Sequence, residues 1–417
     1  MNHLVASSAA QVLFVFLFAP TLSNLGFAQA QTLTTLYNFQ GPPADGMSSG
    51  AGILRDQDGN MYGTTSAGGQ AENGTAFEVD ASATETMLHS FNFLVDGINP
   101  SAPLSLGPGG ALYGTTPLGG PNNAYGTVFR IRDDNLTVVY AFSGGLDGLA
   151  PFGGVVKNID GNLYGTTSQG GTGDCPGGCG TIYQISSAGH ETVVHDFDRL
   201  NGAYPGATLI HDERGNLYGT TVAGGMDNSN ELCPNGCGTV FMLGRSGRFT
   251  VLHKFRYGTS DGWYVPFGVV RDHKGNLYGA TSGGGTSNAG ILYEITSTGE
   301  EKVLYNFAGP PDGQDPGPLV IANGRHYGTT HYGGLASCWV QYGGCGTVFE
   351  FDKSGTEKVL YTFNGVTDGA APVGPLTFDS EGNMYGATAE GMKDNCGFWQ
   401  GGCGTIWKLS PPAADSP

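Results

Sequence analysis

The eight cysteines are the residues whose spacing points most directly to chemistry. They form four local pairs, and each second cysteine stands directly before a glycine. The pairs are Cys175/Cys179, Cys233/Cys237, Cys338/Cys345 and Cys396/Cys403. Such thiols can form disulfides in an oxidising compartment, bind zinc where four ligands converge, or exchange electrons, usually as C-x-x-C. We predict four disulfides that staple local loops, because zinc would need neighbouring loops to converge and the C-x-x-C spacing is missing.

His331 in "THYGG" and Glu390 in "AEGM" are the candidates for acid–base chemistry. Each follows a recurring "YGTT" or "YGAT" segment and departs from the residues found there elsewhere. A histidine and a carboxylate can act as general base and general acid if they meet in a site. The sequence offers neither an evident nucleophile nor an orienting partner for them. Catalysis by this pair is therefore the alternative interpretation, and we expect no metal and no cofactor.

Large aromatic side chains could instead form a binding surface. They gather in three loops of the second half of the chain, two of which contain cysteine pairs. These residues are Trp263, Tyr264, Tyr332, Trp339, Tyr342, Phe398 and Trp399. Sugars or peptide side chains could stack on such rings. The rings could equally cover the loops and pack on the cysteine pairs, and the sequence leaves both interpretations open.

The elements that position these loops belong to a tandem repeat. A tyrosine in "LYGTT"-like segments recurs every 49 to 60 residues, and a period near fifty with β character indicates propeller blades or a β-solenoid. The tyrosines are Tyr62, Tyr113, Tyr164, Tyr218, Tyr278, Tyr327 and Tyr385. Each period contains four short apolar segments joined by turns, here named strands a, b, c and d in chain order. Four such strands form an antiparallel meander, which is a propeller blade.

The strand count predicts how the ring closes. Strands a, b and c occur seven times, but the chain ends after the last c strand, "GTIWKLS", without a d strand. The missing copy is "TTLYNF" (Thr34–Phe39), which precedes the first a strand. We therefore predict an all-β, seven-bladed β-propeller of four-stranded antiparallel blades, with one-plus-three closure by the N-terminal strand. The same register places strands c and d in Phe77–Phe93, although that segment could pass for a helix by propensity.

Two short motifs of the repeat receive structural interpretations. The a–b turns, such as "DQDGN" (Asp56–Asn60), have the look of a calcium loop but lack its distal glutamate and further oxygen ligands. We interpret them as hairpin turns whose glycine needs a positive φ. The glycine of "LYGTT", for example Gly165, is expected to admit a large side chain from an adjacent blade.

The motifs "GNLYGTT..GG…GTVF.I" and "VLY.F…DG" resemble the GloVer tandem repeat of exported bacterial proteins, over nearly all of Thr34–Leu409. The resemblance implies a secreted or surface propeller-like protein without an established activity.

Composition and the N-terminus bound the location and the partners. Residues 1–30 are expected to be a cleaved signal peptide, 31–410 the propeller and 411–417 a short tail, with no later segment able to span a membrane. The formal charge of −18 argues against nucleic acid and anionic membranes as partners. We expect a monomer, secreted or periplasmic.

The b–c connections carry most of the length variation, and in a meander they emerge on the same side as the d–a connections. We call this side the loop face. Because function tends to lie on variable loops over a rigid scaffold, we predict a non-catalytic propeller that binds a glycan, a peptide or another surface partner there. The alternative is an extracytoplasmic polysaccharide lyase or hydrolase with its site on that face or in the central channel.

Overall fold

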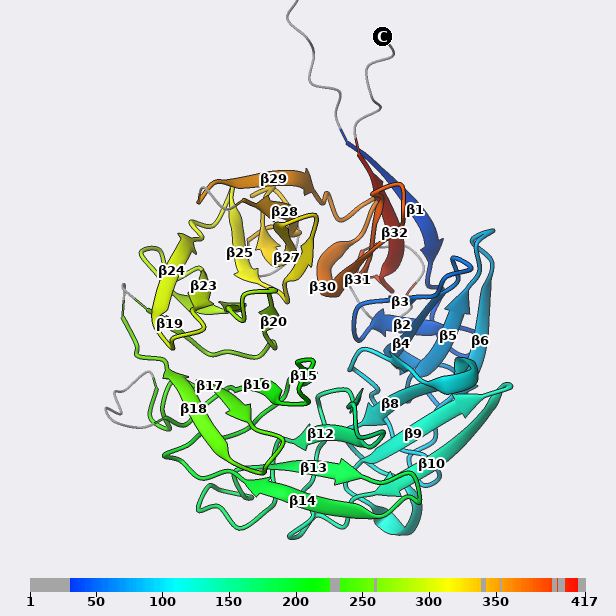
Figure 1. Cartoon of the computed structure of the whole chain (residues 1–417). Coiled ribbons are helices and arrows are strands. Elements are labelled where there is room, and N and C mark those ends of the chain that lie inside the picture. The colour runs from blue at the N-terminus through cyan, green and yellow to red at the C-terminus, as the bar shows by residue number, and fades with distance from the viewer. Residues whose placement is uncertain are drawn as a thin grey trace, which may run out of the picture. The chain divides into compact units, whose positions relative to one another are not determined.

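Seven antiparallel sheets follow one another around a ring in the computed structural model (Figure 1). The structure describes residues 31–225, 233–258, 261–338, 343–352, 355–391, 396 and 402–411. The expected signal peptide lies outside the described residues, as does the tail except for Pro411. No helix among the described residues is long and apolar enough to cross a membrane.

The blades have the following strands, in the order a to d. The first holds β3 (Leu54–Arg55), β4 (Met61–Gly68), β5 (Thr75–Val79) and β6 (Glu85–Ser90), and the second β7 (Ser105–Leu106), β8 (Leu112–Thr116), β9 (Thr127–Arg132) and β10 (Asn135–Ala141). The third holds β11 (Val156–Lys157), β12 (Leu163–Thr167), β13 (Thr181–Ile185) and β14 (Glu191–Asp196), and the fourth β15 (Ile210–His211), β16 (Leu217–Thr221), β17 (Thr239–Leu243) and β18 (Phe249–Lys254). The fifth holds β20 (Val270–Arg271), β21 (Leu277–Thr281), β23 (Ile291–Ile295) and β24 (Glu301–Asn306), and the sixth β26 (Val320–Ala322), β27 (Arg325–Gly333), β28 (Thr347–Phe351) and β29 (Glu357–Thr362). The seventh holds β30 (Ala370–Phe378), β31 (Met384–Glu390), β32 (Thr405–Ser410) and β1 (Thr32–Asn38).

Three d–a connections add a short strand that pairs near the end of the b strand. β2 (Gly46–Ser49) pairs with β4, β25 (Gly313–Pro316) with β27, and β19 (Gly262–Trp263) with β22 (Gly283–Gly284). Two 3-10 turns, η1 (Pro108–Gly110) and η2 (Pro121–Asn123), lie in the second blade. These additional pairings hold the loops of the loop face against the blades.

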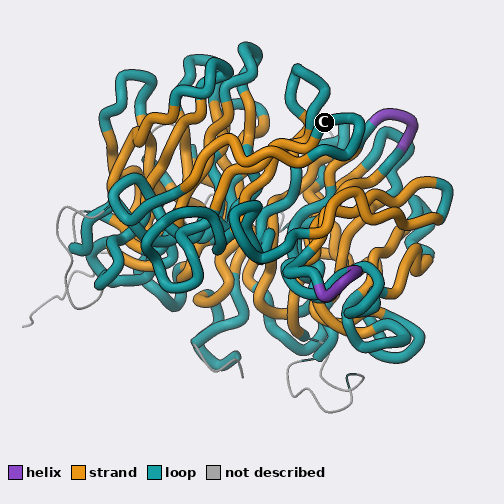
Figure 2. Tube along the Cα trace, turned by 90° about the horizontal axis from the view of Figure 1, so that it is seen from below, coloured by secondary structure: helices purple, strands orange, loops and turns teal. Residues whose placement is uncertain are grey.

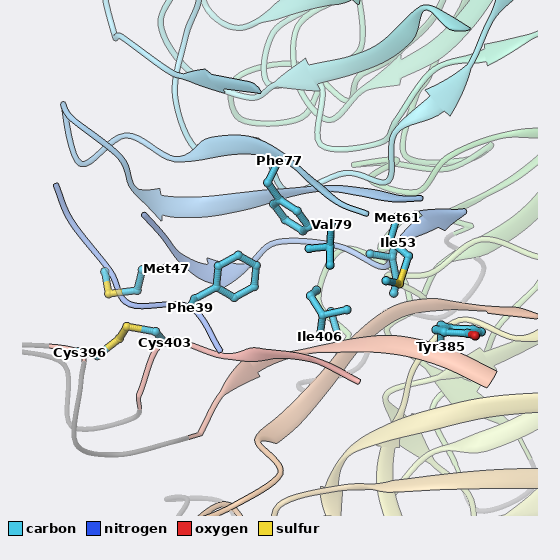
Figure 3. Packing of buried hydrophobic residues seen from close by; sticks show 11 residues of the cluster. Phe39, Met47, Ile53, Met61, Phe77, Val79, Tyr385, Cys396, Cys403 and Ile406 are labelled. Atoms are coloured by element: carbon cyan, nitrogen blue, oxygen red, sulfur yellow. A yellow bond between two sulfur atoms is a disulfide. The ribbon is translucent and has the colours of Figure 1, made fainter. Parts of the chain in front are cut away.

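The predicted closure is confirmed. The N-terminal β1 is antiparallel to the C-terminal β32, with Thr32 opposite Ser410 and Asn38 opposite Thr405, so the two ends of the colour scale lie side by side in Figure 1. Figure 3 shows the core at this junction, where Phe39 lies between the Cys396–Cys403 disulfide and the side chains of Phe77 and Ile406.

The expected role of the motif glycine is wrong in one respect: the large side chain comes from the same blade. Gly165 lies directly opposite Tyr183 in the β12–β13 pairing, and a Cβ on Gly165 would overlap the tyrosine ring. The same pairing of b-strand glycine and c-strand aromatic residue occurs in all seven blades. The pairs are Gly63–Phe77, Gly114–Phe129, Gly165–Tyr183, Gly219–Phe241, Gly279–Tyr293, Gly328–Phe349 and Gly386–Trp407.

Contact between blades comes from the phenylalanine that directly follows each d strand. Its ring meets the c-strand aromatic ring of the next blade with centroids 5.0–5.5 Å apart. These phenylalanines are Phe39, Phe91, Phe142, Phe197, Phe255, Phe307 and Phe363. Each c-strand aromatic residue therefore covers a glycine in its own blade and packs against a phenylalanine of the preceding blade. The same contact recurs at every blade junction of the propeller.

Two local predictions are confirmed. Phe77–Phe93 contains the end of β5, a turn and β6, so tertiary pairing overrides the helical propensity of that segment. In the a–b turns Gly59 and Gly382 have φ of 95° and 82°. Asp56 Oδ1 accepts a hydrogen bond from the Asn60 N–H at 2.8 Å, so the carboxylate is used by the turn itself.

Candidate functional site

Exposed apolar side chains concentrate on the loop face. Twelve of the fourteen large apolar side chains that are exposed among the described residues belong to b–c or d–a connections. They are Phe93, Leu94, Val95, Leu118, Tyr125, Leu146, Phe152, Leu200, Tyr257, Tyr264, Leu335 and Val366. The other two are Leu106 on β7 and Ile159 in an a–b turn. Figure 2 views the ring from its edge, with the strands between two layers of loops.

A pocket of about 380 Å³ lies where the segments entering the a strands converge. Every blade contributes to its wall, so it lies on the axis of the ring, and we call it the axial pocket. One lining residue from each blade is Ala51, Pro103, Phe152, Ala207, Phe267, Leu319 and Gly374. The wall is largely apolar, because these segments carry proline, glycine and small or aromatic residues there.

Among the described residues that line the axial pocket, His331 is the one titratable residue. Its Nδ1 lies 3.2 Å from Asp315 Oδ2, and its ring centroid lies 5.6 Å from that of Phe267. β25 positions the aspartate, since Gln314 pairs with Tyr332 and Pro316 with Thr330, which leaves Asp315 across from His331. A carboxylate at Nδ1 orients the imidazole ring.

Glu390 is not among the residues that line the axial pocket. It is the last residue of β31, and burial raises the pKa of its carboxyl. Counted from Thr330 and Thr388, Glu390 occupies the position of Tyr332 and not that of His331. The imidazole partner that the structure supplies is Asp315, which sequence analysis did not select.

Three of the seven aromatic residues predicted to bind lie in the described residues, and none of the three lines the axial pocket. The Trp263 indole N–H donates to Asn288 Oδ1 at 3.0 Å, and its ring covers Gly283. Tyr332 is half-buried and packs on the cluster that contains Cys345. Tyr264 is 47% exposed. Trp339, Tyr342, Phe398 and Trp399 lie outside the described residues.

All four predicted disulfides are present, with Cα–Cα distances of 5.0–5.6 Å. They join Cys175 to Cys179, Cys233 to Cys237, Cys338 to Cys345, and Cys396 to Cys403.

The expectation that these pairs only staple local loops is incomplete, because they also belong to the core. Cys237 is 4% exposed and packs in one buried cluster with Cys233, Phe255 and Val265. Val265 lies in the connection to the fifth blade, so the disulfide of the fourth blade contacts the blade that follows. The sequence could not show this contact, because it depends on how successive repeats pack.

The second cysteine of each pair also joins two blades through its backbone. Its carbonyl accepts a hydrogen bond from an N–H in the d–a connection of the following blade, at 2.9–3.2 Å. Each staple therefore sits where one blade meets the next. The bonded pairs are Cys179 with Tyr204, Cys237 with Tyr264, Cys345 with Ala371, and Cys403 with Ser48.

Asp315, which sequence analysis did not select, belongs to a motif that recurs in the d–a connections. Asp315 has a φ of 56°, and the equivalent residue of every other d–a connection is also left-handed, with φ between 50° and 60°. These residues are Ser48, Asn99, Ala150, Tyr204, Tyr264 and Ala371. Five of these seven residues directly precede a proline in the motif D-G-x-x-P or N-G-x-x-P. This motif is the sequence signal that could have indicated a shared turn in the d–a connections. Phe152, in the axial pocket, follows directly after such a proline.

The sequence model of one family, described as the Gloeobacter/Verrucomicrobia repeat, matches residues 21–233 and 228–416. No curated protein matches the sequence significantly.

Solved structures resemble the chain at low sequence identity. The extracellular domain of a candidate one-component system of B. thetaiotaomicron is 12% identical with a TM-score of 0.53, over 93% of this chain and 43% of that one. The chain therefore spans less than half the length of that structure. A gluconolactonase of Xanthomonas campestris is 13% identical with a TM-score of 0.43, over 92% of this chain and 91% of the enzyme.

Proposed function

The chain belongs to the Gloeobacter/Verrucomicrobia repeat family, and we propose that it is an extracytoplasmic, non-catalytic propeller that binds a partner on its loop face. The compartment is inferred from the four disulfides, which persist where the environment is oxidising.

The distribution of exposed apolar side chains carries this proposal. A protein surface that gathers nearly all its large exposed apolar residues on one side favours an interaction there over simple solvation. The opposite side, formed by the a–b and c–d turns, contributes Ile159 alone from its described turns, with Leu106 on the adjoining strand. The scaffold below the loop face is closed and stapled, so the loops are presented at fixed positions.

The axial pocket suggests the chemistry of the partner. A volume of about 380 Å³ with an apolar wall suits one or two apolar side chains, with the rings of Phe152 and Phe267 available for stacking. A sugar would need several convergent hydrogen-bonding groups, and the wall offers few. The net charge of −18 favours a neutral or basic partner. We therefore infer that a polypeptide segment with an apolar residue is the partner.

The His331–Asp315 pair favours a second candidate, an enzyme that uses the axial pocket. An imidazole held by a carboxylate at the wall of a pocket is the arrangement of a general base. A hydrolase or lyase would also require a second acid–base group or a nucleophile at the same wall. His331 is the one titratable residue among those described there, and the hydroxyl groups at the wall belong to Ser101 and Thr208.

The test is to screen the purified protein against peptide and glycan arrays and to measure the affinity of the binders by calorimetry. We expect binding of apolar peptides, weakened about tenfold or more by Phe152→Ala and Phe267→Ala, since a buried aromatic contact is worth more than about 1.4 kcal/mol. Leu106→Ala and Ile159→Ala are the matched controls, because they remove apolar side chains about as exposed as Phe152 but away from the loop face.

Equal affinity in all four variants would exclude the axial pocket as the binding surface. Binding of glycans alone would exclude the peptide. Turnover of a bound substrate that His331→Gln abolishes would favour the enzyme.

A further inference from the structure

A second group of side chains lies away from the axial pocket, at the junction of the fourth and fifth blades. His253 on β18, Asp261 in the following d–a connection and Glu301 at the start of β24 each offer one ligand atom, and these atoms all lie within 4.8 Å of one another. We call these three residues the junction cluster. A pocket of about 500 Å³ opens at it, which leaves room for a further ligand such as water.

The repeat shows what is unusual about the junction cluster. The residue equivalent to His253 is a tyrosine at several junctions, and its hydroxyl donates to the aspartate equivalent to Asp261. Three such bonds are Tyr37–Asp45 at 2.9 Å, Tyr140–Asp147 at 3.0 Å and Tyr305–Asp312 at 3.0 Å. A glutamate faces each of these pairs from the next blade, as Glu301 faces Asp261. At the fourth junction a neutral hydroxyl is thus replaced by an imidazole while both carboxylates remain.

Two other histidines, His89 and His195, occupy this repeat position, but neither has both of the equivalent carboxylates. His89 bonds Asp96 at 2.8 Å, but Leu136 stands where the glutamate would be. His195 stacks on Phe249, whose ring centroid is 3.7 Å away. Among the blade junctions that the structure describes, the junction cluster alone combines an imidazole with two carboxylates.

Backbone hydrogen bonds fix the carboxylate of Asp261, but one ring nitrogen of His253 has no hydrogen-bond partner. Asp261 accepts backbone hydrogen bonds from Arg256 at 2.9 Å and from Gly262 at 2.7 Å, which fix its carboxylate. The His253 ring packs edge-on against Phe255 at 4.7 Å. Its Nε2 is buried without a hydrogen-bond partner, because the nearest oxygen of Asp261 is 3.6 Å away. A buried lone nitrogen beside two carboxylates is the position that a cation would fill.

Two basic residues, Lys254 and Arg256, also line the pocket that opens at the cluster. Lys254 follows His253 directly, so its side chain leaves β18 on the other face, where its Cβ approaches Gly225. The equivalent Ser90 and Asn306 bind the b–c loops of their own blades on that face. Arg256 is exposed, and its backbone, not its guanidinium, makes the contact with Asp261.

We propose that His253, Asp261 and Glu301 bind a divalent transition metal ion, with Zn²⁺ as the best match. One imidazole nitrogen and two carboxylate oxygens form a ligand set that zinc accepts, whereas calcium and magnesium prefer oxygen ligands throughout. Three protein ligands leave further coordination positions to water or to a ligand in the adjoining pocket. The ion would tie β18 to β24 and so strengthen one particular blade junction.

The experiment is zinc titration of the full-length, oxidised protein, with metal content measured by mass spectrometry and affinity by calorimetry. The disulfides remove the thiols from competition. We expect one Zn²⁺ per chain, an affinity at least tenfold weaker in His253→Tyr and in Glu301→Gln, and a zinc-dependent rise in melting temperature in the wild type but in neither of these two variants.

His253→Tyr should fold normally, since it restores the tyrosine–aspartate pair of the other junctions, and circular dichroism checks this. His89→Tyr is the matched control, because it makes the same change at a junction without the glutamate and should leave zinc binding intact. A wild-type protein that binds no zinc would overturn the proposal. Equal zinc affinity in His253→Tyr and the wild type would also overturn it, since binding would then come from other histidines.

Discussion

At the scale of single residues, the motif glycines act through the side chain that they lack. In the third blade the ring of Tyr183 occupies the space above Gly165, so the aromatic residue packs directly on the backbone of the neighbouring strand. This explains why "LYGTT" keeps a residue with low strand propensity in the middle of each b strand.

We predict that Gly165→Ala destabilises the protein by about 1–3 kcal/mol, because the new methyl group would force the buried ring of Tyr183 to move. Urea unfolding measures the change. Gly145→Ala is the control, since a Cβ there meets only Ser143 Oγ at 3.8 Å, and its effect should stay within about 0.5 kcal/mol. Equal effects of both substitutions would contradict the packing role.

Three glutamates at blade junctions predict how stability depends on pH. Burial, reinforced by the aspartate that each one faces, raises the pKa of Glu85, Glu191 and Glu357 to about 7, from an ordinary value of 4.5. The folded chain thus holds these protons more tightly than the unfolded chain. The resulting stability is fully present below about pH 4.5 and is lost as the pH rises through 7.

We therefore expect a lower free energy of unfolding at pH 8 than at pH 5, by roughly 1 kcal/mol for each glutamate once its partial exposure to solvent is taken into account. The triple variant Glu85→Gln/Glu191→Gln/Glu357→Gln should lose most of this difference. Glu300→Gln, which changes an exposed carboxylate in a c–d turn, should keep it. Denaturant titrations at the two pH values test the prediction, and an unchanged difference in the triple variant would refute it.

At the scale of elements, each disulfide fastens a b–c loop where its blade meets the next one. Removing one pair by Cys175→Ser/Cys179→Ser should lower the free energy of unfolding by about 2 kcal/mol, as expected for a closed loop of five residues. The far-ultraviolet circular dichroism should be unchanged, because the strands do not depend on the staple.

The bonds themselves are checked by alkylation of the denatured protein and mass spectrometry, because most of these cysteines are buried in the fold. We expect no modified cysteine before reduction and eight afterwards. Alkylation of the non-reduced protein would show that the pairs are open.

The strands and turns could be predicted because the same strand and turn motifs recur in each repeat. Alternation and glycine placement in one copy are ambiguous, as in Phe77–Phe93, and seven copies in register remove the ambiguity. The disulfides were predictable because their partners are near in sequence. The axial pocket was not, because each of its walls comes from a different repeat. The contact of His331 with Asp315 also depends on β25, a strand that exists only as an addition to the repeat.

At the scale of the whole molecule, the ring depends on one junction whose two sides come from opposite ends of the chain. Phe39 is 1% exposed and packs in one buried cluster with Ile406 and Cys403 from the C-terminal end. We predict that Phe39→Ala costs about 3–5 kcal/mol, as expected for deletion of a fully buried aromatic ring.

Phe142→Ala, at an interior junction, should cost a similar amount, and Phe93→Ala, which is 45% exposed, should cost little. Differential scanning calorimetry compares the three. If Phe39→Ala behaved like Phe93→Ala, the N-terminal strand would not close the ring.

The pairing of β1 with β32 also sets the order of events during synthesis. Thr32 emerges early, but its partner Ser410 is 378 positions further along the chain (410 − 32). Until then the first strand has no sheet to join, and the nascent chain carries an unpaired strand at one end and an incomplete blade at the other. A chain released prematurely would expose both edges. Only a polypeptide translated through its seventh repeat can pair both edges. A chain that ends earlier therefore cannot complete the fold.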